Sequence, residues 1–109
     1  MLAWAIERDV EYRFWGRGSA VVVRDKGVRG VVVKLGEGFA AATIERAGDE
    51  VAIVAGAAMP ARELALLALS ENLAGLDRLA SEGGTVGGFI CAGVAADKGN
   101  RPAHGYAVQ

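Results

Sequence analysis

A glycine-rich stretch late in the chain, residues 82–88, constrains the fold more than any other feature. It reads Glu-Gly-Gly-Thr-Val-Gly-Gly. Thr85 is a favourable helix N-cap, because its hydroxyl can accept a backbone N–H of the first turn. A phosphate binds at such a helix start when the N–H groups of residues 85–87 face open space. The alternative is close packing of a helix through small residues, and the stretch alone does not decide between the two.

A second glycine-rich turn, Gly16-Arg17-Gly18-Ser19, follows an alternating segment at residues 10–15 that predicts a half-buried strand. Its N–H groups and the Ser19 hydroxyl suit a pyrophosphate. Spacing alone favours a plain tight turn, because short glycine patterns are common. The turn is not the dinucleotide fingerprint GxGxxG, since Val21 occupies the position of the third glycine.

The remaining segments predict an α+β domain with a small mixed or antiparallel sheet flanked by two or three helices. Continuous apolar runs predict strands that are covered on both faces, and a hairpin-like link is expected between the second and third strands. Gly48 and Asp49 suit a turn between the last two strands. The expected strands are 10–15, 20–23, 31–35, 41–45 and 51–54, and the expected helices are 2–8, 61–73 and 85–95, with a short turn at 76–80.

The predicted core follows from helical spacing and residue type. On the helix at 61–73, Leu66, Leu69 and Leu73 form one apolar stripe, which Leu64 and Leu67 widen. Cysteine in an apolar context is usually a buried small hydrophobe. The other residues assigned to the core are Trp4, Phe14, Trp15, Phe39 and Cys91.

Size and charge exclude several classes of function. The 109 residues suffice for one small domain, and a net charge of −1 gives no footprint for nucleic acid or an anionic membrane. One histidine and one cysteine cannot form a recognised metal cluster or an internal disulfide. No apolar run reaches the roughly 20 residues of a membrane span, and the start does not read as a signal peptide. We therefore expect a cytoplasmic protein without a metal site.

The order of these segments is specific. Residues 16–25 are followed by 27–35, then 54–57, 73–80, Gly-Thr-Val-Gly-Gly at 84–88 and Ala-Gly-Val at 92–94. This series resembles the FAD-binding region of UDP-N-acetylenolpyruvoylglucosamine reductase, also called UDP-N-acetylmuramate dehydrogenase. The resemblance covers residues 2–96 and implies a truncated FAD-binding domain of the vanillyl-alcohol-oxidase type. Residues 97–109 are expected to form a loop or tail.

The resemblance implies which residues contact FAD, mainly at its pyrophosphate. The first glycine turn takes one side of the cofactor, the second takes another, and residues 56–57 begin a turn close by. The implied FAD-binding residues are Gly16, Gly18, Ser19, Gly56, Gly84, Thr85, Gly87 and Gly88.

The chain departs from the family pattern at three positions. Ala20 stands where the family has Asn after its first-loop Ser, Gly83 replaces the Pro before Gly-Thr-Val-Gly-Gly, and Cys91 replaces an Asn. The family's substrate-binding Arg and Tyr, its proton-donating Ser and its catalytic Glu have no counterpart here. His104 and Tyr106 lie in the tail and match none of them. No catalytic residue is therefore assigned.

Two functional interpretations remain open. The chain is a flavin-binding module of a peptidoglycan-synthesis oxidoreductase, inactive alone, or a cofactor-free interaction domain derived from that fold. The family's first strand–helix–strand layer is largely absent, which leaves apolar surface uncovered. We therefore expect a homo-oligomer or a completing partner chain, and no nucleic acid or membrane partner.

Overall fold

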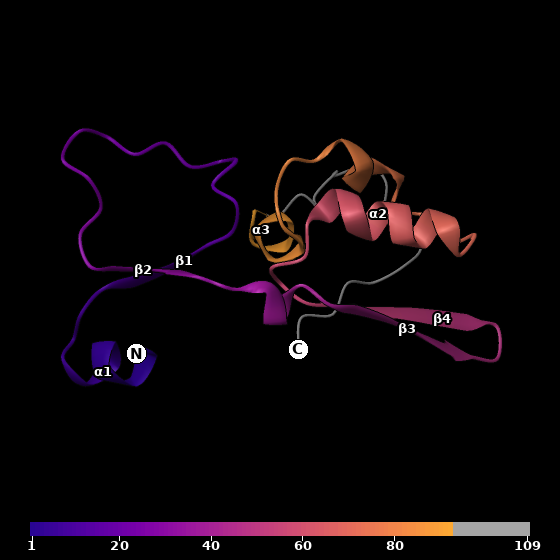
Figure 1. The fold of residues 1–109 in the computed structure, drawn as a ribbon, viewed down its shortest axis with the longest axis horizontal. Coiled ribbons are helices and arrows are strands. Elements are labelled where there is room, and N and C mark those ends of the chain that lie inside the picture. Colours follow the sequence, from indigo (N-terminus) through magenta and orange to yellow (C-terminus); the bar gives the residue numbers. More distant parts are fainter. Residues whose placement is uncertain (93–109) are drawn as a thin grey trace.

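The computed structural model describes residues 1–92, and this part of the chain is a small mixed α/β structure (Figure 1). It has three α-helices and two separate two-stranded sheets, so the broad fold prediction is confirmed, although one common sheet is not formed. The predicted tail at 97–109, the end of the helix predicted at 85–95, and His104 and Tyr106 lie outside the described residues.

The N-terminal half consists of helix α1 (Leu2–Glu7) and strands β1 (Tyr12–Trp15) and β2 (Val31–Lys34). The two strands are parallel, with Tyr12 opposite Val31. A parallel pair needs a crossover connection, and here residues 16–30 provide it as a long loop beside the sheet (Figure 1). The first glycine turn therefore begins this crossover.

The strand predicted at residues 20–23 is wrong. These residues are irregular and exposed, and Val22 retains 93% of its side-chain exposure. The expected hairpin link to residues 31–35 is wrong for the same reason, because β1 already occupies the place beside β2. β-branched residues favour strands only where a pairing partner and a covered face exist.

The C-terminal half begins with a short 3₁₀ turn, η1 (Glu37–Phe39), and the antiparallel strands β3 (Ala42–Ala47) and β4 (Glu50–Ala55). The predicted turn at residues 48–49 joins them, with Gly48 at a φ of 61°. The prediction of cover on both faces is wrong here: Ile53 is half-buried, whereas Val54 beside it is exposed. Only one face of this hairpin packs against the core.

The core lies in the C-terminal half, where helix α2 (Ala61–Ser70) packs against the 3₁₀ helix η2 (Asp77–Ser81) and helix α3 (Val86–Cys91). Small residues on the inner face of α2 allow close approach of these elements. The buried cluster consists of Met59, Ala61, Leu64, Ala65, Leu79 and Val86.

The buried face of α2 is not the leucine stripe that was predicted. Leu64 is buried at 6% exposure, whereas Leu66 and Leu69 are 51% and 66% exposed. The inner face instead follows positions 61, 64, 65 and 68, which also satisfy helical spacing. Leucine and alanine were equally compatible with the periodicity, and tertiary packing selected the face with more alanine.

The aromatic residues assigned to the core are also largely outside it. Trp4, Phe14 and Phe39 are exposed, Trp15 is half-buried, and the Cys91 thiol is exposed. For Phe14, which lies on β1, the physical reason is that no second layer covers the β1–β2 sheet within residues 1–92. The half-buried character predicted for this strand is therefore wrong at Tyr12 and Phe14, which are exposed.

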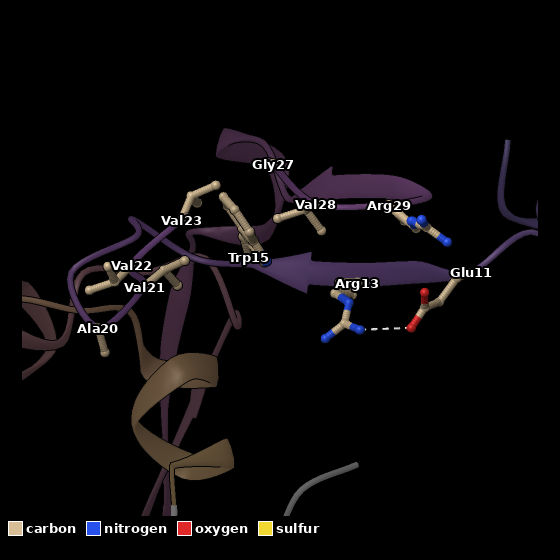
Figure 2. Close-up of a pocket in the computed structure, with 10 residues that line it drawn as sticks. All are labelled: Glu11, Arg13, Trp15, Ala20, Val21, Val22, Val23, Gly27, Val28 and Arg29. Carbon is tan, nitrogen blue, oxygen red and sulfur yellow. Dashed lines mark hydrogen bonds and ion pairs between the residues drawn. The ribbon is translucent and has the colours of Figure 1, made fainter. Parts of the chain in front are cut away.

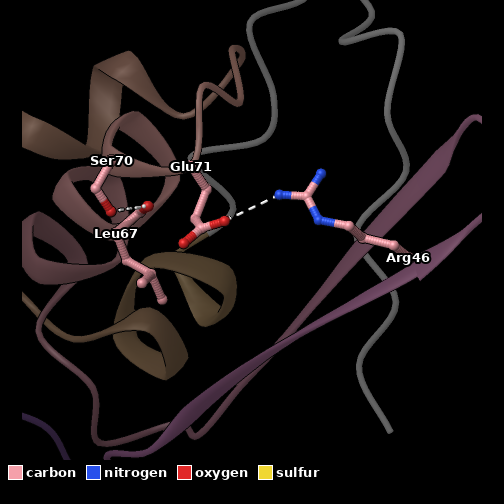
Figure 3. A network of polar contacts seen from close by, with 4 residues as sticks. All are labelled: Arg46, Leu67, Ser70 and Glu71. Carbon is pink, nitrogen blue, oxygen red and sulfur yellow. Dashed lines mark hydrogen bonds and ion pairs between the residues drawn. The ribbon is translucent and has the colours of Figure 1, made fainter.

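An ion pair ties the hairpin to the end of α2. Arg46 on β3 lies 2.9 Å from the Glu71 carboxylate, and the Ser70 hydroxyl donates to the Leu67 carbonyl at 2.8 Å (Figure 3). Both charged side chains are about half exposed, so the pair contributes at most about 1 kcal/mol. The burial of Leu64 and its neighbours therefore matters more to the stability of this half.

A pair of leucine truncations on α2 tests the assignment of the core face. Leu64→Ala is expected to lower the free energy of unfolding by about 2–4 kcal/mol, since it removes buried methyl groups and leaves a cavity. Leu69→Ala, on the same helix, is expected to cost under about 1 kcal/mol, because its side chain already faces solvent. Urea unfolding followed by circular dichroism measures both, and equal losses would contradict the assigned face.

Candidate functional site

The structure brings the two glycine-rich turns together. Gly16 lies against the Thr85 side chain so closely that a Cβ at position 16 would overlap its hydroxyl. A Cβ on Gly84 would lie 3.3 Å from the Ser19 hydroxyl oxygen. The two turns are far apart in sequence, so this contact is a tertiary feature. The residues predicted to share one ligand therefore lie beside one another.

The third predicted segment, which begins at Gly56, supports the second turn. The N–H groups of Gly87 and Val86 donate to the carbonyls of Ala57 and Met59, at 3.0 and 2.8 Å. A Cβ on Gly87 would lie 2.9 Å from the Ala57 Cβ. Gly56 itself has no room for a Cβ, because the Phe39 carbonyl occupies that space. These glycines permit close backbone packing.

Thr85 caps helix α3, as predicted. Its hydroxyl oxygen accepts the N–H of Gly88 at 3.2 Å, and the residue is only 4% exposed. A buried hydroxyl needs such a partner, so the cap also satisfies Thr85. The cap therefore uses the Gly88 N–H internally.

The expectation of open N–H groups at the start of α3 is wrong for Val86 and Gly87, which donate to Met59 and Ala57. Neighbouring carbonyls already satisfy them, so they are not available to a phosphate. Among residues 1–92 no acceptor is present for the N–H group of Thr85, nor for those of Gly18, Ser19 and Gly84. Donors for an anion therefore remain on the first turn and at the entrance of the second.

An open depression of about 500 Å³ lies next to this junction, although none of the predicted cofactor-binding residues lines it. Its wall includes Ala58 and Pro60, and Pro60 pairs with Thr85 as an isolated β-bridge. Arg17 from the first glycine turn and Lys34 from the end of β2 also line it. Sequence reasoning did not single out either cation; the available signal was a basic residue inside the glycine turn.

A second hollow, of about 610 Å³, lies beside β1 and the crossover loop (Figure 2). Its lining includes Trp15, Val28 and the exposed valine loop at residues 21–23. Arg13 on its rim is held 2.7 Å from the Glu11 carboxylate. None of the residues of the second glycine turn lines either hollow.

Residues 1–92 contain no group of three or more His, Cys, Asp or Glu side chains placed to hold a metal ion. No helix among them is both long and apolar enough to cross a membrane.

Comparison with known proteins gives a consistent result, although no family model matches the chain. UDP-N-acetylenolpyruvoylglucosamine reductase from Caulobacter sp. (strain K31) is 49% identical over 73 residues, which are 67% of this chain and 23% of that protein. The enzyme of the same name from Desulforamulus reducens is 39% identical over 87 residues, 80% of this chain and 27% of the relative. The enzyme of that name from Wolbachia pipientis subsp. Culex pipiens is 43% identical over 75 residues, which are 69% of this chain and 24% of the relative.

This chain is homologous to one part of UDP-N-acetylenolpyruvoylglucosamine reductase. The resemblance inferred from the ordered segments is thereby confirmed. The chain spans about a quarter of the length of these reductases.

The packing role of Gly87 gives a direct test. Gly87→Ala places a methyl group against Ala57 and is expected to lower the free energy of unfolding by about 1–3 kcal/mol, despite the better helix propensity of alanine. Gly38→Ala is the control, because no atom lies within 4 Å of a Cβ at that position. Thermal unfolding compares the two variants. An unchanged or raised melting temperature for Gly87→Ala would contradict the packing.

Proposed function

We propose that this chain is an FAD-binding module of the UDP-N-acetylenolpyruvoylglucosamine reductase type, with a truncated domain of the vanillyl-alcohol-oxidase fold. The observation that carries the proposal is the contact between the first glycine turn and residues 84–85. The homology and the order of the glycine segments support it. A dinucleotide needs closely approaching backbone and N–H donors, and both are available at this junction.

The predicted site residues would contribute to cofactor binding in two ways, as hydrogen-bond donors and as packing contacts between the turns. Gly18, Ser19 and Gly84 offer N–H groups that no described residue uses, and Ser19 adds a hydroxyl. The other predicted site residues hold the turns together by close packing, by the helix cap or by backbone hydrogen bonds. These are Gly16, Gly56, Thr85, Gly87 and Gly88.

Bound FAD would supply hydride transfer, and this chain would supply part of its binding site. The proposed module is inactive alone, because none of its residues is assigned as proton donor to a substrate. Enclosure by the protein buries most of a ligand of this size in a typical site. We therefore propose weak binding of FAD by the isolated chain.

Ser19→Asp tests the cofactor proposal with little effect on folding, because the side chain is exposed. Wild-type protein is expected to bind FAD, and the variant at least about tenfold more weakly, since a carboxylate repels the pyrophosphate. Ser81→Asp, at the end of η2, is the control and should bind as the wild type does. Isothermal titration and flavin fluorescence measure the affinities.

The same titration distinguishes the proposed function from the alternative of a cofactor-free domain. A cofactor-free domain is favoured by the internal use of the N–H groups of Val86 and Gly87. It predicts no response of the wild type to FAD and equal behaviour of all three proteins. With NADPH and enolpyruvyl-UDP-N-acetylglucosamine added, we expect no NADPH oxidation by the isolated chain; clear turnover would contradict the proposed inactivity.

We also propose that the chain self-associates through the uncovered N-terminal half. Parallel sheets are normally covered on both faces, yet Phe14 on β1 and Val22 in the crossover are exposed. Within residues 1–92, eight hydrophobic residues are buried while sixteen large ones are exposed, and such patches favour association.

Light scattering after size exclusion tests the proposed self-association. Wild-type protein is expected to elute as a dimer or larger species, and Val22→Lys is expected to shift the population toward monomer without loss of stability. Thr43→Lys, on an exposed position of β3, serves as the control. A monomer mass for the wild type at high concentration would overturn the proposal.

A further inference from the structure

Strand β1 has an open edge, which carries an inference that rests on the proposed self-association and names its contact surface. Within residues 1–92, β1 pairs with β2 alone, so no strand lies beside the opposite edge of β1. An open edge presents unpaired N–H and C=O groups, which pair readily with a strand of another chain. This edge is therefore a candidate interface.

The backbone of β1 presents alternate residues to the open edge. The Val31 N–H donates to the Glu11 carbonyl at 2.8 Å, so the carbonyl of Glu11 faces β2. Backbone groups of successive residues in a strand point to opposite edges, and those of Tyr12 and Phe14 therefore face away from β2. These groups are the hydrogen-bonding positions that a further strand would use.

The side chains of β1 carry opposite charges at a spacing that suits antiparallel self-pairing. Glu11 and Arg13 form an ion pair of 2.7 Å beside the strand (Figure 2), and both side chains are more than half exposed. When a second copy lies antiparallel with Tyr12 opposite Tyr12, Glu11 of each copy lies opposite Arg13 of the other. Opposite charges at facing positions stabilise a pair of strands.

The same register pairs the backbone groups of the open edge. Tyr12 exchanges both hydrogen bonds with Tyr12 of the second copy, and the Phe14 N–H meets the Val10 carbonyl. The Val10 N–H takes no part, because it already donates to the Ala5 carbonyl at 2.8 Å. The Tyr12 and Phe14 rings, which are 40% and 54% exposed and touch edge to face, then lie beside their counterparts.

Other pairings complement this edge less well. A shift that places Tyr12 opposite Phe14 also places Arg13 opposite Arg13, and like charges at facing positions are destabilising. A pairing centred on Phe14 needs Gly16 as part of the strand, yet Gly16 is packed against the second glycine turn. The strand β2 carries Lys34 and no acidic residue, so its own open edge offers a second copy no opposite charge.

We propose that β1 of one chain pairs antiparallel with β1 of a second copy, about a two-fold axis at Tyr12. The pairing joins the two-stranded sheets of both copies into one continuous sheet. Such a two-fold contact is self-complementary, because the contact that one copy makes is repeated by the other. Glu11 and Arg13 determine the register, and Tyr12 and Phe14 supply the backbone hydrogen bonds.

Two charge variants test the contact by mixing. Glu11→Arg makes both facing positions positive and Arg13→Glu makes both negative, so each variant alone is expected to dimerise at least about tenfold more weakly than wild type. Both variants lose the ion pair within the chain, so its loss cannot explain a recovery on mixing. An equimolar mixture is expected to regain a dimer of nearly wild-type affinity in analytical ultracentrifugation under reducing conditions.

Glu50→Arg, at the exposed start of β4, changes the net charge equally and is expected to dimerise as the wild type does. Charge variants that dimerise alone as tightly as wild type, or a mixture that associates no better than its components, would overturn the proposal.

Cysteine crosslinking tests the register. In a Cys91→Ser background, Tyr12→Cys places two thiols at facing positions whose Cα atoms lie about 5.5 Å apart, a distance that suits a disulfide. Phe14→Cys, the matched control on the same strand, leaves the two thiols about 13 Å apart along the strands. Mild oxidation is expected to crosslink Tyr12→Cys at least about tenfold faster. Equal rates, or faster crosslinking of Phe14→Cys, would contradict the register.

The outcomes separate this contact from the proposals made before it. A wild-type dimer that both charge variants leave intact would overturn the β1 contact and retain self-association. A monomeric wild type would overturn both. The affinity for FAD is measured independently, so failure of the FAD proposal would leave the β1 contact standing.

Discussion

The close approach of the start of α3 to the segment at residues 57–59 is the constraint on which the rest of this structure depends. Two backbone hydrogen bonds, from Val86 and Gly87, hold the helix start against that segment. Gly87 permits them, because a larger side chain would meet Ala57. Val86 then enters the buried cluster beside Leu64, so the glycine contact and the core form together.

This contact also settles what the second glycine turn can contribute to a ligand. A helix start binds phosphate only through N–H groups that no protein group accepts. Here the Ala57 and Met59 carbonyls and the Thr85 hydroxyl accept them. The turn therefore lies against the first loop through Gly16 and Thr85, and in the proposed binding mode the anion is held mainly by that loop.

Local signals in the sequence predicted much of this fold. The Thr85 cap, the helix after Pro60, the turn at residues 48–49 and four of the five strands are present, because capping and turn chemistry act over a few residues. The proximity of the glycine turns followed only from the family resemblance. Burial was predicted less well, since periodicity allowed two faces of α2 and only packing distinguished them.

The errors at Phe14, Trp4 and residues 20–23 share one physical cause. Their composition suits a covered sheet, and in residues 1–92 no layer covers it. The strand at residues 20–23 was predicted from residue type alone. In the structure β2 pairs with β1, and residues 20–23 belong to the crossover loop between them.

The division between backbone and side-chain contributions has a further consequence for ligand affinity. Backbone N–H groups are fixed dipoles whose contribution is little affected by salt, whereas exposed cations such as Arg17 and Lys34 are screened within about 10 Å at moderate ionic strength. In the proposed site, where the Val86 and Gly87 N–H groups are already used, nearby cations would carry a larger share of phosphate binding. Affinity in this chain should therefore depend on ionic strength more than in a site that binds phosphate through a free helix N-terminus.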